Sequence, residues 1–297
     1  MQTNSPSSQS KSALLGLILG LIGVVIFAGT LPATRIAVVS FDAGFLTFGR
    51  AVIAGLAAII CIVAMGKKFP RQHLGALLFA GLTLVFGFPG FMTLAMYTVP
   101  ASHGGVVLGI LPLATAVFAT LLAGERPSPL FWLCGILGAV LILIFTFRDS
   151  GFGFVIGDLW LLVAGIIASA GYVVSGKLSR HMPGWEVISW ALILLLPISV
   201  IGTWFFWQFE YLHAPTPQMW AFAYVSLCSM FLGFFAWNTG LQLGGIAKVG
   251  QLQLLQTFIT LGIAAVVVGE HISLETLAFA GAVLVIVLVG RKAQVAR

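Results

Sequence analysis

The most constraining feature of the chain is an internal repeat, in which the second half resembles the first. At an offset of 145 residues, Gly124 and Glu125 align with Gly269 and Glu270. The same offset aligns Thr115 with Thr260, Ala119 with Ala264 and Ser128 with Ser273. Nearer the start of each half, an offset of 142 aligns Gly23 with Gly165, Ala28-Gly29 with Ala170-Gly171 and Arg35 with Lys177. If each half crosses a membrane five times, the halves have opposite orientations. Inverted repeats are typical of transporters, because two mirror-related halves can rock around one shared site.

Composition places the chain in a lipid bilayer. Sixty per cent of its residues are apolar, only 7% are charged, and the mean hydropathy is +1.12. A soluble domain carries roughly 25% charged residues. The three cysteines lie separately in apolar segments, so they indicate neither a disulfide framework nor a metal site. The basic residues that give the net charge of +6 are scattered along loops, which argues against a nucleic-acid partner.

Hydropathy and the repeat predict an all-α polytopic membrane protein with ten transmembrane helices in two inverted five-helix repeats. The expected spans are 13–36, 43–65, 73–95, 101–123, 129–147, 155–176, 186–207, 218–240, 246–268 and 274–291. The first repeat is then 13–147 and the second 155–291. Residues 1–12 are expected to be a disordered cytoplasmic N-terminus, and 292–297 a cytoplasmic C-terminus.

Loop charges predict the orientation. With the N-terminus inside, eleven lysines and arginines fall on the inner side, and only Arg35, Arg50 and Arg148 on the outer side. This excess follows the positive-inside rule. We therefore expect an inner-membrane protein with both termini in the cytoplasm.

Several motifs resemble those of the drug/metabolite transporter superfamily, in its ten-helix EamA branch. One is the Phe48-Gly49-Arg50 stretch that opens the second span, and another is the Gly-Glu pair that closes both the fourth and the ninth span. A third is the pattern Pro112…Gly124-Glu125…Ser128…Gly135. The second half repeats it more loosely as Gly269-Glu270…Ser273…Gly281. Length and phenylalanine content also resemble bacterial exporters of amino acids, including aromatic ones. The resemblance implies a central cavity lined mainly by the third and fourth helices of each repeat.

The ninth span carries an unusual number of polar side chains. Gln253, Gln256, Thr257 and Thr260 share one helical face, and Gln251 lies nearby. Polar groups are costly inside a bilayer, so they are candidates for substrate binding. Amide and hydroxyl groups can hydrogen-bond a zwitterionic solute. The alternative is that they hold neighbouring helices together. Tyr97, Trp237 and Asn238 are further candidates for the cavity wall.

Cations at helix ends form a second candidate group. His103 aligns with Lys248 at the offset of 145, each near a helix N-terminus that favours anions. Arg35 and Lys177 are also repeat partners near helix ends. Lys248, Arg35 and Lys177 could act in gating, or they could set topology and stabilise helix ends.

Proline and glycine interrupt two of the spans. Pro89 and Gly90 lie in the third, and Pro112 in the fourth, where they could act as hinges or as close-packing sites. We expect structural roles for Glu125 and Glu270, as partners of a nearby cation or as caps of a neighbouring helix.

The sequence lacks acidic residues at mid-membrane depth and the motifs of ATP-driven transport and of enzymes. No Asp or Glu lies in the middle third of any expected span, and Asp158 is the deepest. We therefore expect the solute to move by facilitated transport down its own gradient. Proton antiport through His103 is the alternative mechanism. The chain has no phosphate-binding loop for ATP, and no HExxH or GxSxG motif of an enzyme. No cofactor or metal is expected, and the oligomeric state is left open.

The sequence predicts a transporter that exports small organic solutes or facilitates their movement by alternating access without ATP. Amino acids, including aromatic or other apolar ones, fit a glutamine-bearing cavity with aromatic walls. The alternative is a broad-specificity drug or metabolite exporter coupled to protons. The expected partners are a small-molecule substrate and the lipid bilayer.

Overall fold

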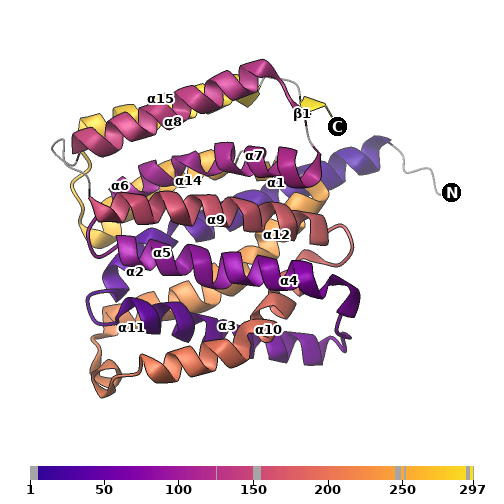
Figure 1. Ribbon diagram of the computed structural model, residues 1–297, viewed down its shortest axis with the longest axis vertical. Helices are drawn as coiled ribbons and strands as arrows, with labels where there is room; N and C mark the ends of the chain where they lie inside the picture. Colours follow the sequence, from indigo (N-terminus) through magenta and orange to yellow (C-terminus); the bar gives the residue numbers. More distant parts are fainter. Residues whose placement is uncertain are drawn as a thin grey trace.

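The computed structural model describes residues 6–124, 126–149, 155–244, 249–250, 252–291 and 295–296. They form a helical bundle whose helices run roughly side by side (Figure 1). Seven helical stretches are long and apolar enough to cross a membrane, and Trp132–Phe145, Leu255–Val268 and Leu274–Ile286 are shorter apolar helices. Together they correspond to the ten expected spans.

The first half contains five spans. They are α1 (Pro6–Ala28) with α2 (Thr30–Ala37); α3 (Ala43–Ala64); η1 (Arg71–His73), α4 (Leu74–Gly81), η2 (Leu82–Gly87) and α5 (Phe88–Ala95); α6 (Ala101–Val107), η3 (Leu108–Ile110) and α7 (Leu111–Ala123); and α8 (Pro129–Asp149). The N-terminal helix begins earlier than expected, so residues 6–12, predicted as disordered, lie in its first turns. Pro6 suits that position, because the first helical residue needs no N–H donor.

The second half follows the same order. It contains α9 (Ile156–Leu178), α10 (Gly184–Phe205), η4 (Phe209–His213), α11 (Thr216–Ala223) with η5 (Tyr224–Leu232) and α12 (Gly233–Gly244), α14 (Gln253–Ile263) with η6 (Ala264–Val268), and α15 (Leu274–Arg291). Two short strands, β1 (Arg126–Pro127) and β2 (Val295–Ala296), pair antiparallel with Arg126 opposite Ala296.

Equivalent helices of the two halves pack against each other. The second spans, α3 and α10, are neighbours, and the fifth spans, α8 and α15, lie side by side at one edge (Figure 1). The first span of each half contacts the third span of the other, through α1 with α12 and α9 with α5. This reciprocal pattern is what two inverted repeats produce.

Glycines permit the closest of these contacts. A Cβ on Gly240 of α12 would lie 2.7 Å from the backbone nitrogen of Gly20 in α1, and a Cβ on Gly16 would lie 2.4 Å from that of Gly244. Without side chains the two backbones approach directly, as small residues allow in membrane bundles. The halves are therefore joined tightly along α1 and α12.

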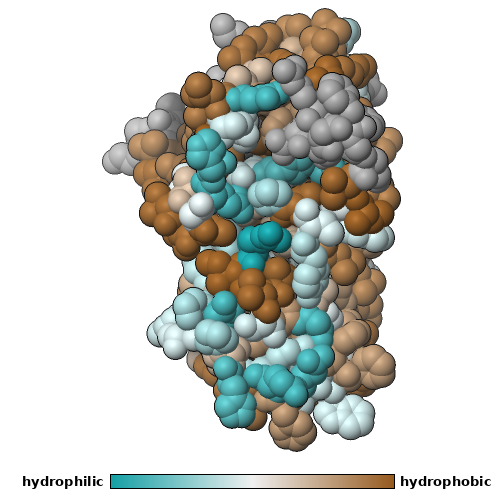
Figure 2. Space-filling view, turned by 90° about the vertical axis from the view of Figure 1, so that its left-hand side faces the viewer, coloured by the Kyte–Doolittle hydropathy of each residue, from teal (hydrophilic) through white to brown (hydrophobic). Residues whose placement is uncertain are grey.

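The end of the bundle opposite the two termini has a mixed surface. Hydrophilic residues gather along the middle of this end and hydrophobic residues flank them (Figure 2). A polar end face between apolar sides suits a bundle whose sides contact lipid and whose end meets water.

Candidate functional site

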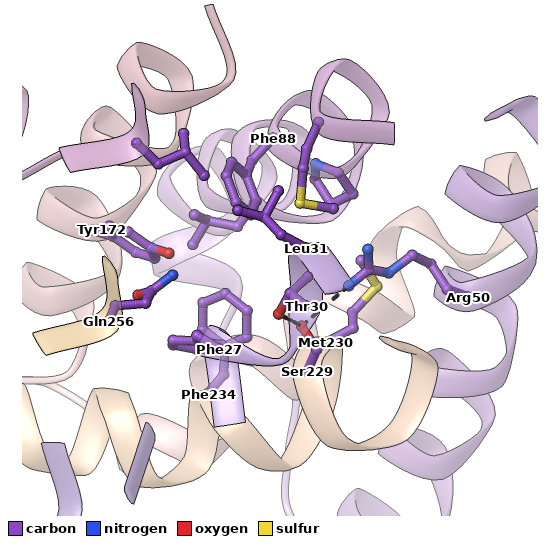
Figure 3. Close-up of a pocket in the computed structure, with 14 residues that line it drawn as sticks. Phe27, Thr30, Leu31, Arg50, Phe88, Tyr172, Ser229, Met230, Phe234 and Gln256 are labelled. Atoms are coloured by element: carbon purple, nitrogen blue, oxygen red, sulfur yellow. Dashed lines mark hydrogen bonds between the residues drawn. The ribbon is translucent and has the colours of Figure 1, made fainter. Parts of the chain in front are cut away.

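An internal cavity lies between helices of both halves. It has a volume of about 20 Å³ and is lined by Phe27, Thr30, Leu31, Arg50, Leu84, Phe88, Pro89, Met92, Leu108, Tyr172, Ser229, Met230, Phe234 and Gln256 (Figure 3). This volume is too small for an organic solute, so a solute enters only if the lining helices separate. A solute inside it would touch α1, α2, α3, η2, α5, η3, α9, η5, α12 and α14.

One wall of this cavity is cationic. Arg50 on α3 is 3% exposed, and its Nη2 donates to Ser229 Oγ at 3.3 Å. The Ser229 hydroxyl also meets Thr30 Oγ1 at 2.8 Å. Three polar side chains from α2, α3 and η5 thus form a chain of hydrogen bonds at this wall (Figure 3).

A smaller cavity adjoins the first. It has a volume of about 10 Å³ and is lined by Leu31, Gly105, Leu108, Leu111, Gln253, Gln256, Thr257 and Thr260. Leu31, Leu108 and Gln256 line both cavities, so Gln256 stands at their junction. The glutamine face expected from the sequence therefore faces interior space, except for Gln251, which lies outside the described residues.

The two threonines of this face already have partners. Thr257 Oγ1 donates to Gly105 O at 3.1 Å, and Thr260 Oγ1 donates to Ala28 O at 2.9 Å. The two threonines therefore hold neighbouring helices together, which was the alternative to substrate binding. The amides differ: Gln256 Oε1 and both amide atoms of Gln253 are buried without a hydrogen-bond partner. The amides are therefore the groups of this face that are available to a solute.

His103 lies in the first turn of α6, as expected, and is buried in protein. Its Nε2 lies 2.7 Å from Oδ1 of Asp158, and the two residues are 3% and 0% exposed. Phe145 of α8 packs on the imidazole, with ring centroids 5.0 Å apart. The ring is thus enclosed between α6, α8 and α9, two residues before Gly105 on the wall of the smaller cavity.

Three other predicted wall residues lie elsewhere. Tyr97 is 44% exposed and donates to Phe41 O. Asn238 is fully buried, accepting from Ser175 Oγ and donating to Gly184 O, so it ties α12 to α9 and α10. Trp237 packs edge-on against Phe27, behind the cavity wall.

The predicted gating cations bind helix C-termini. Arg35 of α2 donates to Met96 O just after α5, and Lys177 Nζ of α9 donates to Leu122 O near the end of α7 at 2.7 Å. Cations at these positions satisfy free carbonyls and favour the negative end of the helix dipole. Lys248 lies outside the described residues.

The predicted hinges coincide with irregular helix geometry. The π-helical segment η2 ends just before α5, whose first turn contains Pro89, and the 3₁₀ turn η3 precedes Pro112 in α7. Proline lacks the N–H that would continue a regular α-helix across these points. Pro89 also lines the larger cavity, whereas Gly90 faces Thr47 of α3.

Glu270 caps a helix of the other half. Its Oε1 and Oε2 accept from the backbone N–H groups of Ala101 and Ser102, each at 2.8 Å. Gly269 before it has φ of +76°, and Gly124 has φ of +69°. Glycine adopts this left-handed conformation without strain, which explains why it ends both helices. Glu125 lies outside the described residues.

Arg50, counted on the outer side at the opening of the second span, is not a loop charge. It lies in the second turn of α3, buried against the cavity, because the helix begins at Ala43. The signal that could have found it was its position seven residues inside an apolar span, where an ionisable side chain is costly and therefore functional by default.

Polar contacts also join the halves beyond the cavity. At the end opposite the termini, Tyr211 of η4 donates to the carboxylate of Asp42, which caps α3 by accepting from Phe45 N at 2.9 Å. Burial, with the hydrogen bond to Asp42, raises the pKa of Tyr211. Near the termini, Lys67 Nζ lies 2.6 Å from Glu186 Oε1.

A bundle of apolar helices, built as two repeats around an interior cavity with a few polar groups, defines a membrane transporter of the inverted-repeat class. Comparison with known protein families also indicates a transporter and identifies the family. The profile described as the EamA-like transporter family matches residues 14–147 and 155–290, one match in each half. The chain belongs to this family, within the drug/metabolite transporter superfamily.

Relatives of the chain are also transporters by name. It is 42% identical over 278 residues to the uncharacterized transporter YdeK of Bacillus subtilis, covering 93% of this chain and 97% of that one. It is 23% identical over 262 residues to a probable terminal-alkyne amino-acid exporter of Streptantibioticus cattleyicolor, covering 83% of each. A crystal structure that is 21% identical, with a TM-score of 0.68 over 93% of this chain and 97% of that one, shares the fold.

Proposed function

We propose that the protein is an alternating-access carrier that exports small organic solutes, or facilitates their movement, without ATP. Its best-supported substrates are amino acids with an aromatic or other apolar side chain. The observation that carries this proposal is the cavity between the repeats, where Gln256 presents an unpartnered amide oxygen beside aromatic walls. A family of transporters and a relative named as an amino-acid exporter support it.

The cavity has the chemical character that such a substrate needs. Phe27, Phe88 and Phe234 give it an apolar lining, which suits a hydrophobic side chain. The amides can hydrogen-bond the amino or carboxylate group of a zwitterion. Since the lining comes from both repeats, a relative rotation of the halves would open the cavity to one side of the membrane and then to the other.

The proposed location is the bacterial inner membrane, with both termini in the cytoplasm. The excess of basic residues in the expected inner loops supports this orientation. In that arrangement the end of the bundle shown in Figure 2 faces away from the cytoplasm.

Counterflow in proteoliposomes tests the function. Vesicles are preloaded with one unlabelled amino acid per assay, and trace labelled phenylalanine or threonine is added outside. A carrier accumulates label transiently and saturably. Gln256→Ala should cut this flux while the amount of inserted protein is unchanged. No exchange with any amino acid would remove the substrate class, and conductance without saturation would remove the carrier mechanism.

A second candidate is a broad-specificity drug or metabolite exporter coupled to protons. The buried His103–Asp158 pair favours it, because intramembrane carboxylates and histidines commonly carry protons in transporters. Repeating counterflow with a pH gradient separates the two candidates. Uptake that follows the gradient in the wild type and loses that dependence in His103→Gln supports proton coupling, and indifference to the gradient supports facilitated movement.

A further inference from the structure

The charge of Arg50 has no counterpart near it in the described part of the chain. No carboxylate there lies within 4 Å of the guanidinium, and its Nε is buried without a hydrogen-bond partner. The carboxylates of Asp42, Asp158, Glu186 and Glu270 are engaged with Tyr211, His103, Lys67 and the N-terminus of α6, respectively. A buried charge without a counterion is costly in a low-dielectric interior. An anion from outside the chain would offset that cost.

The place of this charge indicates how an anion reaches it. Arg50 lines the larger cavity, and the hydroxyls of Ser229 and Thr30 beside it add hydrogen-bonding groups to the same wall (Figure 3). Guanidinium groups bind carboxylates through parallel N–H donors, a geometry that gives both affinity and orientation. The donor at Nε remains available for such a contact.

A second pole lies across the cavity. Gln256 projects toward the space from the side of Tyr172, whereas Arg50 approaches from the opposite side (Figure 3). The unpartnered Gln256 Oε1 can accept hydrogen bonds from an ammonium group. Between the two poles the lining is aromatic and aliphatic.

We infer that Arg50 binds the carboxylate of the transported solute, with Gln256 accepting from its amino group. The site thereby selects solutes that bear one carboxylate over amines that lack it. A single arginine neutralises one negative charge, which matches a carboxylate better than a phosphate dianion. The inference rests on the proposed function for the identity of the cavity as the transport site, but anion binding at Arg50 can be measured without transport.

Binding to the full-length protein in detergent provides the test. Thermal unfolding is followed with L-phenylalanine, phenethylamine, inorganic phosphate or chloride added at equal concentrations and constant ionic strength. L-Phenylalanine and phenethylamine differ only in the carboxylate. We expect L-phenylalanine to stabilise the wild type and phenethylamine to bind about 10- to 100-fold more weakly, as expected for the loss of a charge-assisted contact.

Substitutions at Arg50 test whether this residue gives the preference for a carboxylate. Arg50→Gln should remove the preference for L-phenylalanine over phenethylamine, and Arg50→Lys should keep part of it because the charge remains. Arg71→Gln, at an exposed arginine of η1, is the matched control and should keep the full preference. If Arg50→Gln does not fold, the comparison of L-phenylalanine with phenethylamine on the wild type still decides whether the protein prefers a ligand with a carboxylate.

The outcomes are distinct. Equal binding of L-phenylalanine and phenethylamine to the wild type, or no binding of either, overturns the inference. Stabilisation by chloride or phosphate as strong as that by L-phenylalanine overturns the assignment to a carboxylate. Carboxylate-selective binding without counterflow would keep the anion site and contradict the carrier function. Counterflow without a carboxylate preference would keep the carrier and remove the role of Arg50.

Discussion

The Nε2 atom of His103 and the Oδ1 atom of Asp158 lie 2.7 Å apart and join the fourth span of the first repeat to the first span of the second. Both side chains are buried, so the pair is shielded from water. Breaking a buried pair by removing one partner typically costs about 3–5 kcal/mol, because the other charge stays buried. Replacing both partners by apolar groups can be much less harmful.

A double-mutant cycle on this pair should therefore be non-additive. We expect His103→Ala to lower the unfolding temperature strongly, because the Asp158 carboxylate loses its imidazole partner. The double variant, with Asp158→Ala as well, should recover part of that loss. Thermal unfolding in one detergent measures all four proteins. Additive effects would show that the two side chains stabilise the fold independently.

Glu270 offers a test of a contact between the halves. Its carboxylate accepts two backbone hydrogen bonds at the N-terminus of α6, where the helix dipole favours negative charge. Glu270→Ala should cost about 1–2 kcal/mol, in the range of lost helix caps, and Glu270→Gln should cost less because one acceptor oxygen remains. The exposed Glu210→Gln is the control. If Glu270→Ala is as stable as this control, the cap contributes nothing.

The contact between Tyr211 and Asp42 makes a prediction about alkaline pH. Burial raises the pKa of Tyr211, and the hydrogen bond to Asp42 raises it further. Because the folded pKa exceeds the unfolded value near 10.0, the contribution to stability is complete below pH 10 and is lost as the pH rises toward the folded pKa. Unfolding temperatures of the wild type should therefore fall more steeply above pH 10 than those of Tyr211→Phe. Parallel curves would contradict this.

The glycine contact between α1 and α12 predicts a steric effect. Gly240→Ala places a Cβ 2.7 Å from the backbone nitrogen of Gly20, where no flexible side chain can yield. We expect a loss of about 1–3 kcal/mol, as for overpacked interiors. Gly281→Ala in α15 is the matched control, since nothing lies within 4 Å of its new Cβ. Equal unfolding temperatures for the two variants would show that the helices shift apart freely.

The fold could be predicted because it follows from local and periodic signals. Apolar length predicted the spans, and Pro89 and Pro112 predicted where two of them depart from regular α-geometry. The site was only partly predictable. Gln253 and Gln256 stood out because polar residues are rare in an apolar helix. Arg50 was missed because a helix that is apolar all round gives no periodic signal of which face meets a cavity.

Contacts between distant residues were the least predictable part. His103 and Asp158 are 55 residues apart in sequence, and neither residue alone indicates the other. Glu270 was expected to pair with a cation or cap a helix, but only the packing of the second half on the first selects the N-terminus of α6. Such pairings depend on how helices are placed, which hydropathy does not specify.

The ion pair between Lys67 and Glu186 predicts a rescue by charge exchange. The pair joins the loop after α3 to the first turn of α10, and Lys67 also lies 5.8 Å from the ring centroid of Trp185. The Lys67 side chain is 36% exposed, so the pair is worth about 1 kcal/mol or less, and salt weakens it. Lys67→Glu places two carboxylates together and should lower the unfolding temperature at low salt. Adding Glu186→Lys should restore it, whereas Lys68→Glu, at the neighbouring exposed lysine, should have little effect. If the double variant is no more stable than Lys67→Glu, the lysine acts through its stacking on Trp185 rather than through the ion pair.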